Sequence, residues 1–556
     1  MSIASELSLV IRNARIVDGT GAAARSGDLA VAADRIVAVG RVDGRGAREI
    51  DAHGHVVAPG FIDIHTHYDP QLCWDRLATP SPEHGVTTLV VGNCSVTLAP
   101  VRAAHRDRII KIFGSVEDME SSLLEHTVPF SWESFAEYLA YLRPGLGPNV
   151  GVFIGHAILR MYVMGDAARQ RAATNSEIEA MCEVLRHALR AGAFGLSFTF
   201  AHLDEQGRAL PCAYADRGEK LALIRTLAAE RRGLVEVAPN LVSGEQTLMA
   251  CIDEFGQFAL ETGVTCSLSP LLYSPLLGDQ WLKMLNRFEH WQQRGAPLYA
   301  QTQTRPLDMT MQISKGSVVL SKGAQWRQIF ELPAAQRIDR LRDPQVRRQL
   351  RPETEGNSRI AALTVKRTHA PANELYIGRQ LGDIAAEQGK PLLDVLLDIA
   401  LADDLHTEFS FSGLVHADVA VVAKLLDHPG IHIGSADAGA HINQFCGAGD
   451  TCYLIEKFVR QERLMTLERA VQRLTSDLAH AWRIADRGEL APGRFADLVI
   501  FDPDTISRGE EVWVEDIPGG NGRYVRHPTG VDQVIVNGEL LVDQGRYSAS
   551  RPGCLI

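Results

Sequence analysis

Two histidines end an apolar segment of the sequence at a spacing of two residues. The segment reads PGFIDIHTH and places His65 and His67 after a run typical of a buried strand. Side chains two positions apart on an extended chain point to the same side, so both imidazoles can bind one ion. Asp63 shares this face one layer deeper, where we expect it to orient a histidine. The pattern predicts a metal site; the alternative is a pair of histidines satisfied by the backbone in a turn.

Two other apolar segments also end in side chains that bind metals. VVGNC ends in Cys94, whose thiolate would be a good zinc ligand. GSADAGAH contains Asp437, a carboxylate that can bind a metal and accept a proton from its water. Taken singly, a cysteine is more often a small buried hydrophobe, and an aspartate before small residues is an ordinary turn former. Their common position at strand ends favours the metal site.

These residues can meet only if the strands that carry them are neighbours. The central sequence alternates apolar strand-like runs with amphipathic helical runs, the pattern of a parallel sheet. We predict eight strands, at 56–67, 85–93, 150–155, 193–200, 234–238, 264–268, 297–301 and 431–437. Eight such units indicate an α/β fold, a (β/α)8 TIM-like barrel, whose active sites lie at the carboxyl ends of the strands.

The two ends of the chain have a different pattern. Short alternating strands separated by glycines occur at both termini, and the C-terminal set includes a hairpin signal at Asn537-Gly538. Neither set can bury a face alone, so we expect a small β-sandwich built from both termini, residues 1–57 with 488–556. The barrel would span 58–487, with an inserted lid subdomain at about 302–430, because that gap is too long for a loop.

Composition excludes several classes of protein. The 556 residues are 46% hydrophobic and 22% charged, which is typical of a globular protein and not of a disordered one. A net charge of -12 argues against nucleic acid or an anionic membrane as a partner and favours a small molecule. The charged N-terminal stretch resembles no signal peptide, so we expect a cytoplasmic protein. The nine cysteines are scattered along the chain, so we expect them to be thiols and not disulfides. The Arg-rich run at 337–351 is expected to be a solvated helix face or a homo-oligomer contact.

The combined motifs resemble the amidohydrolase superfamily, and within it the N-acyl-D-amino-acid deacylases, or D-aminoacylases. The likeness covers nearly the whole chain and rests on RNARIVDGTG, APGFIDIHTHYDPQLCWD, HGVTTLVVGNCSVTLAP, GHAILR, GAFGLSFT, GSADAGAH and RGELAPGRFADLVIFD. It implies a barrel capped by a sandwich, one or two zinc ions, and metal-activated water attacking an amide. By this resemblance His65 and His67 are the paired metal-binding histidines, Cys94 the bridging thiolate, and Asp437 the metal-bound general acid and base.

The sequence departs from this family at several functional positions. The resemblance calls for two further histidines at the ends of the fifth and sixth strands, where the chain reads LVEVAP and TCSLS. It also calls for a lysine after the sixth strand and an arginine after Asp437, and SLSPLLYSP and AHINQFCG contain neither. We therefore favour one zinc ion. In the alternative, a second ion or the substrate is bound by some of the following side chains: Glu236, Cys266, His156, His202 and His441. Arg160 could pair with a substrate carboxylate or form a structural salt bridge.

Three functions remain open from the sequence. The first is zinc-dependent hydrolysis of the amide bond of an N-acyl amino acid or a related small amide. The second is hydrolysis of a cyclic amide, an aryl amide or a peptide-like compound, which the altered pocket residues favour. The third is a catalytically silent barrel that serves as a binding scaffold, which the missing histidines favour.

Overall fold

The computed structural model describes residues 6–117, 119–307, 309–315, 320 and 323–556. The chain forms two compact units: Met1–Arg305 with Asp418–Ile556, and Pro306–Ala417. The second unit falls inside the insertion predicted at about 302–430. The boundaries between sandwich and barrel, at 57–58 and 487–488, stay predictions.

A sheet of eight parallel strands forms the centre of the first unit, and its strand order follows the chain. The strands are β6 (Phe61–Asp63), β7 (Val86–Val91), β8 (Asn149–Gly155), β9 (Gly195–Thr199), β10 (Leu234–Ala238), β11 (Cys266–Leu268), β12 (Leu298–Thr302) and β16 (Ile431–Ile433). A parallel bridge between Thr66 and Ala438 joins the segments that follow β6 and β16. The predicted α/β barrel fold is therefore confirmed.

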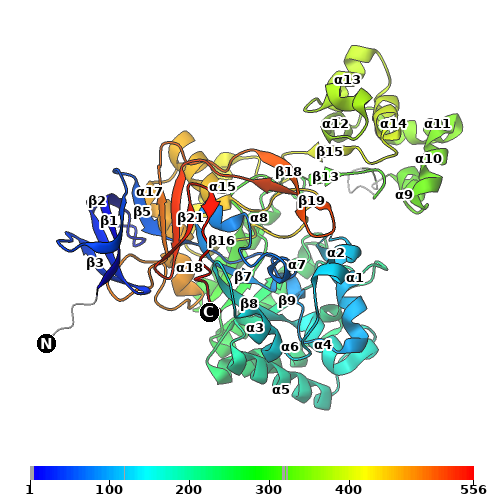
Figure 1. Cartoon of the computed structure of the whole chain (residues 1–556). Coiled ribbons are helices and arrows are strands. Elements are labelled where there is room, and N and C mark those ends of the chain that lie inside the picture. The colour runs from blue at the N-terminus through cyan, green and yellow to red at the C-terminus, as the bar shows by residue number, and fades with distance from the viewer. Residues whose placement is uncertain (1–5, 118, 308, 316–319, 321–322) are drawn as a thin grey trace. The chain divides into compact units, whose positions relative to one another are not determined.

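Helices cover the outside of this barrel. Every residue of β7, β8, β9 and β10 is buried, because side chains fill the interior and helices pack on the outer face. In the outer layer α5 lies beside α4 and α6 (Figure 1). The α-helices of this unit are α1 (Arg106–Val116), α2 (Ser121–Thr127), α3 (Phe135–Leu142), α4 (His156–Met164), α5 (Asn175–Ala191), α6 (Arg217–Glu230), α7 (Glu245–Thr262), α8 (Gln280–Gln293), α15 (Val419–Asp427), α16 (Asp450–Tyr453), α17 (Leu467–Leu474) and α18 (Ser476–Ala481).

The strand predicted at 56–67 is two strands in the structure. β5 (Val56–Pro59) pairs with the terminal strands, whereas β6 belongs to the barrel. The chain changes sheets at Gly60, where a Cβ atom would lie 2.2 Å from the side chain of Thr87. Glycine permits this close approach of the backbone. His65 and His67 consequently lie beyond β6, on the segment that leads out of the barrel.

Strands from both ends of the chain pair in one sheet of nine strands. Its order is β22-β21-β20-β17-β5-β1-β2-β3, with β4 beside β1. Antiparallel pairing of β5 with β17 joins the N-terminal strands to the C-terminal ones, coloured blue and red in Figure 1. The strands not yet given are β1 (Leu7–Ile16), β2 (Arg25–Ala32), β3 (Arg35–Gly40), β4 (Gly46–Asp51), β17 (Leu498–Phe501), β20 (Val531–Val536), β21 (Glu539–Asp543) and β22 (Arg546–Tyr547), and a separate pair, β18 (Glu511–Ile517) and β19 (Asn521–Arg526).

The second unit has its own core of apolar side chains, which includes Trp326 and Phe409. Its elements are a sheet of β13 (Met309–Met311), β15 (Glu408–Phe411) and β14 (Thr364–Arg367), and helices α9 (Ala324–Phe330), α10 (Ala334–Arg342), α11 (Pro344–Thr354), α12 (Ser358–Ala361), α13 (Leu381–Gln388) and α14 (Leu392–Ala402). In the Arg-rich run, Arg347 and Arg351 both form ion pairs with Asp394 of α14. Part of this run therefore holds the unit together.

Candidate metal centre

The segment after β6 carries two buried histidines close together. His65 and His67 are each 2% exposed, and their ring centroids are 5.3 Å apart. The backbone between them is fixed on both sides, because Thr66 N donates to Val90 O and His67 N donates to Ala438 O. The alternation predicted from the sequence thus brings both rings to one side of the segment.

Cys94 reaches the histidines from a tight turn that follows β7. The turn is the 3-10 segment η3 (Asn93–Ser95), and Gly92, Cys94 and Ser95 all have positive φ, at 80°, 53° and 63°. Asn93 Nδ2 ties the turn down by donating to Thr66 O and Val90 O. In this conformation the Cys94 Sγ atom lies 3.5 Å from His65 Nε2.

Asp437 completes the cluster from the segment after β16. Its Oδ1 atom lies 3.3 Å from His65 Nε2 and 3.7 Å from His67 Nε2. The Asp437 side chain is 33% exposed, whereas both histidines are buried. Asp437 is therefore the member of this cluster that solvent and a substrate can reach.

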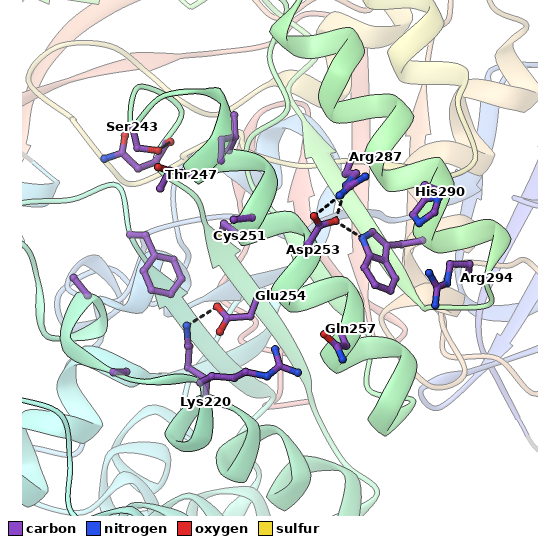
Figure 2. A pocket seen from close by; sticks show the side chains of 18 residues that line it. Lys220, Ser243, Thr247, Cys251, Asp253, Glu254, Gln257, Arg287, His290 and Arg294 are labelled. Carbon is purple, nitrogen blue, oxygen red and sulfur yellow. Dashed lines mark hydrogen bonds and ion pairs between the residues drawn. The ribbon is translucent and has the colours of Figure 1, made fainter.

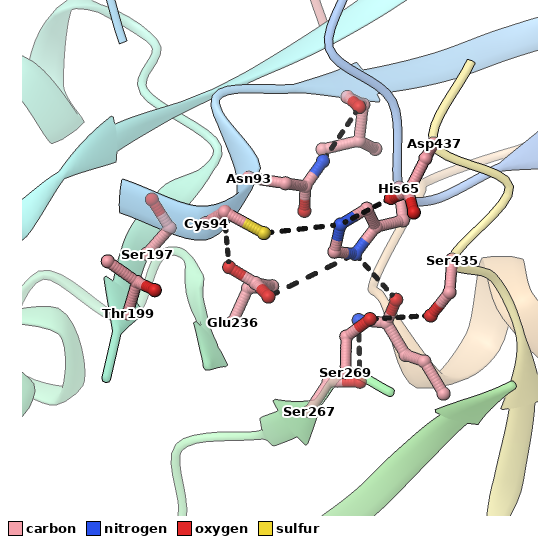
Figure 3. A network of polar contacts seen from close by, with 12 residues as sticks. His65, Asn93, Cys94, Ser197, Thr199, Glu236, Ser267, Ser269, Ser435 and Asp437 are labelled. Atoms are coloured by element: carbon pink, nitrogen blue, oxygen red, sulfur yellow. Dashed lines mark hydrogen bonds and ion pairs between the residues drawn. The ribbon is translucent and has the colours of Figure 1, made fainter. Parts of the chain in front are cut away.

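These side chains form a set of donor atoms suited to a divalent cation. One atom each of His65, His67 and Cys94 lies within 4.8 Å of the other two. In Figure 3 the Cys94 sulfur and the Asp437 carboxylate both face the ring of His65. Two imidazole nitrogens, a thiolate and a carboxylate oxygen are ligands that zinc prefers, and a catalytic zinc site needs about three of them together with a water molecule. The residues present therefore fit the metal that the sequence predicts.

Two further residues orient the histidines from behind. Gln301 Oε1, at the end of β12, lies 3.0 Å from His65 Nδ1, and Glu117 Oε1, just after α1, lies 3.2 Å from His67 Nδ1. The Gln301 acceptor at Nδ1 of His65 places the ring proton there and leaves Nε2 free to bind a metal, whereas Glu117 acts on His67 through its charge. Neither residue was predicted from the sequence. Gln301 could have been found as the last residue of a predicted strand, but Glu117 has no local signal.

The electrostatics of the cluster favour a cation. Burial lowers the pKa of His65 to about 4. Burial also opposes protonation of His67, but Glu117 and Asp437 outweigh it and raise the pKa of His67 to about 9. Burial and the neighbouring carboxylates raise the pKa of the Cys94 thiol well above its usual value. Without a cation this thiol stays protonated, whereas coordination to a metal would deprotonate it.

Three other predicted residues lie at or near the cluster. Glu236 of β10 is fully buried; its Oε2 accepts a hydrogen bond of 2.9 Å from Cys94 N, and its Oε1 is 4.0 Å from His65 Nδ1. His202 follows β9, where its Nδ1 lies 2.8 Å from Thr199 Oγ1, and His441 N donates to the backbone oxygen of Glu117. Burial and then the charges of His67 and His441 lower the pKa of His202 to about 4. The structure gives none of the three a contact with the Cys94 sulfur or with Nε2 of His65 or His67.

Two more of the predicted residues, His156 and Arg160, have their polar groups engaged elsewhere. His156 Nε2 lies 2.8 Å from Glu219 Oε1, and Arg160 forms an ion pair with the same carboxylate. All three side chains are fully buried on α4 and α6. We therefore leave His156 and Arg160 out of the proposed set of ligands.

A large hollow lies elsewhere on this unit, with a volume of about 910 Å³. Residues of α6, α7 and α8 line much of it (Figure 2). Its acidic side chains are paired within the hollow: Glu254 with Lys220, and Asp253 with Arg287 and Trp291 Nε1. These acidic side chains already have partners within the hollow. They are therefore not arranged to bind a metal ion as the residues after β6, β7 and β16 are.

Comparison with known proteins agrees with this geometry. Residues 48–542 match the Amidohydrolase family. The chain belongs to the amidohydrolase family. It is 29% identical to D-aminoacylase of Alcaligenes xylosoxydans xylosoxydans over 98% of this chain and 96% of that protein. It is 28% identical to the N-acyl-D-aspartate deacylase of the same organism, with coverage of 99% and 95%.

Solved structures show the same relationship for this member of the amidohydrolase family. A D-aminoacylase studied for its binuclear metal center superposes with a TM-score of 0.69 at 25% identity, covering 99% of both chains. The N-acyl-D-glutamate deacylase of Bordetella bronchiseptica, complexed with zinc and a phosphonate inhibitor, gives 0.67 at 28% identity, again with 99% coverage of both. The resemblance to the D-aminoacylase branch is confirmed, and the chain is a metal-dependent hydrolase of amide bonds. None of the helices among the described residues is both long and apolar enough to span a membrane.

Proposed function

We propose that this amidohydrolase cleaves the amide bond of an N-acyl-D-amino acid or a related small amide. The observation that carries the proposal is the convergence of His65, His67, Cys94 and Asp437 from three separate barrel strands. Relatives that span almost the whole chain are named for deacylation of N-acyl-D-amino acids, which supports this class of substrate. The partner of the site is thus a small molecule.

We propose that the site holds a single zinc ion. The mixed nitrogen, sulfur and oxygen donors favour zinc over harder ions such as Mg²⁺ or Ca²⁺. The segments where the family resemblance calls for further histidines contain Glu236 in β10 and Cys266 and Ser267 in β11, and no histidine. Glu236 Oε2 is already bonded to Cys94 N, so it supports the turn that carries one ligand. When bound, the metal would lower the pKa of a water molecule towards ~7 and polarise the amide carbonyl.

Asp437 is the proposed general base and acid. Burial opposes its ionisation, but a hydrogen bond from His67 and the charges of His65 and His67 keep its pKa below the usual value. Asp437 is therefore ionised at neutral pH and, being partly exposed, can accept a proton from the attacking water. It then delivers that proton to the leaving nitrogen, because an amide nitrogen leaves poorly unless it is protonated.

A second candidate function is hydrolysis of a cyclic, aryl or peptide-like amide without a free carboxylate. The lysine and arginine that the family resemblance calls for are missing from the segments after β11 and after Asp437. Arg305, the last residue before the inserted unit in the sequence, is not a substitute, because it is buried and bound to Asp450 and to Ala436 O. The structure thus provides a specific reason to test neutral amides.

Metal analysis combined with a substrate panel would test these proposals. We expect about one zinc ion per chain and release of free amine from N-acyl-D-amino acids but not from their L counterparts. Turnover confined to cyclic or aryl amides would favour the second candidate. A chain that binds less than about a tenth of an ion, and stays inert after zinc is added, would contradict both and support a binding scaffold.

A further inference from the structure

A second cluster of ionisable side chains lies behind the metal centre. Cys212 of the 3-10 segment η6 (Pro211–Tyr214) places Sγ 3.2 Å from His156 Nδ1, at the start of α4. The other ring nitrogen, His156 Nε2, lies 2.8 Å from Glu219 Oε1 on α6, and Arg160 pairs with Glu219. All four side chains are fully buried. The proposed mechanism uses none of them.

The contacts of His156 suit an ion pair with Cys212. His156 has an acceptor at each ring nitrogen, so the imidazolium form can donate to both. Burial opposes ionisation of Cys212, but His156 and a hydrogen bond from Ser95 hold the pKa of the thiol below its usual value. Burial likewise opposes protonation of His156, and Cys212 and Glu219 together raise its pKa. Both shifts favour the thiolate of Cys212 and the imidazolium of His156, with the Glu219 carboxylate on the far side of the ring.

One hydrogen-bonded link connects the thiolate to the turn that carries Cys94. Ser95 Oγ accepts a hydrogen bond of 2.7 Å from Ala157 N and lies 3.3 Å from Cys212 Sγ. Because the Ser95 oxygen accepts from Ala157, its hydroxyl proton is free to donate to the sulfur. Ser95 directly follows Cys94, and both have positive φ, which is costly for residues other than glycine. Contacts from outside the turn must hold it in this conformation.

We propose that Cys212 is a positioning residue that holds η3 so that the Cys94 sulfur faces His65 and Asp437. This inference rests on the proposed function, in which Cys94 is a metal ligand. Besides the hydrogen bonds of Asn93, two contacts from other strands hold the same turn: Cys94 N donates to Glu236 Oε2, and Ser95 N donates to Ser197 Oγ. Cys212 differs from these groups because it bonds the side-chain hydroxyl of Ser95, whereas Glu236 and Ser197 accept from backbone N–H groups of the turn.

Removal of the sulfur should loosen the turn. In Cys212→Ala, the Ser95 hydroxyl and His156 Nδ1 would both lose their acceptor in a site without solvent access. The turn could then relax from its left-handed conformation, and the Cys94 sulfur would move from the position that faces His65. Loss of a residue that orients a metal ligand typically costs 10- to 100-fold in metal affinity.

Cobalt binding to the full-length protein provides a test that does not depend on activity. Co²⁺ bound by a thiolate absorbs in the near ultraviolet, and the Cys94→Ala variant shows how much of this absorption belongs to Cys94. We expect Cys212→Ala to bind Co²⁺ about 10- to 100-fold more weakly in a chelator competition, with a reduced thiolate band. Cys182→Ala is the matched control, because Cys182 is a half-buried thiol on neighbouring α5 that makes none of the hydrogen bonds described for η3. It should change the affinity less than about 3-fold.

The outcomes separate this inference from the proposed function. Cys212→Ser restores an acceptor and should recover most of the affinity for Co²⁺. Equal losses of affinity in the serine and alanine variants would mean that packing alone holds the turn, and this result would overturn the inference. Wild-type affinity and a full thiolate band in Cys212→Ala would also overturn it. If Cys212→Ala does not fold, Ser95→Ala tests the same hydrogen-bonded link and should lose Co²⁺ affinity to the same extent. An unchanged thiolate band in Ser95→Ala would reject the inference. A wild-type protein whose cobalt spectrum does not depend on Cys94 would contradict the proposed ligand set and, with it, this inference.

Discussion

Asp437→Asn tests the proposed mechanism most directly. Asparagine keeps the size of the side chain and one carbonyl oxygen, but it cannot accept a proton from water at neutral pH. We expect kcat to fall by 10²- to 10⁴-fold, the usual contribution of a general base. At 1.36 kcal/mol for each factor of ten, this is about 2.7 to 5.4 kcal/mol in the activation barrier.

The structure indicates why the fold should survive this substitution. The carboxylate is partly exposed, and its contacts at 3.3 and 3.7 Å are with the two histidines, not with the apolar core. The backbone contact from Asp437 N to His65 O is unaffected by the side chain. We therefore expect the free energy of unfolding to change by less than about 1 kcal/mol, within the range of mild surface substitutions.

The assay must separate loss of the base from loss of the metal. Initial rates of amine release are measured at saturating zinc, with zinc content determined on the same samples, so that kcat is compared between fully loaded proteins. Asp418→Asn is the control, because Asp418 caps α15 through its side chain and asparagine is an equally good cap. A loaded Asp437→Asn protein with kcat within about 3-fold of wild type would refute the assignment of Asp437 as the base.

Four further results are expected. Cys94→Ala should lower zinc content at limiting metal, and unchanged stoichiometry would reduce Cys94 to a packing residue. Glu117→Gln should weaken zinc binding about 10- to 100-fold in a chelator titration, because the acceptor behind His67 loses its charge; unchanged affinity would argue against that support. Gly92→Ala should destabilise the protein by about 1–3 kcal/mol in denaturant unfolding, since φ is 80° and the new Cβ would lie 2.6 Å from Phe153 O; an unchanged midpoint would contradict this. Dialysis against a chelator should abolish activity and added zinc should restore it, whereas activity that survives complete metal removal would exclude the metal-dependent reaction.

The sequence by itself determined the features that depend on local spacing. Alternation along an extended chain put His65 and His67 on one side, and the alternation of strands and helices gave the barrel. A barrel brings the carboxyl ends of its strands to one mouth, so Cys94 and Asp437 could be placed there although they are 343 positions apart (437 minus 94). The division of the strand predicted at 56–67 was missed, because β5 pairs with β17 from the far end of the chain.

The tertiary structure alone decided which side chains support the metal centre. Glu117 and Gln301 reach the two histidines from a helix end and from the seventh barrel strand, and no local pattern marks that contact. His156 looked equally suited to the mouth of the barrel, yet its ring is buried between Cys212 and Glu219. Periodicity fixes the face on which a side chain lies, but its partner across the fold depends on barrel closure and helix packing, which join residues far apart in the sequence.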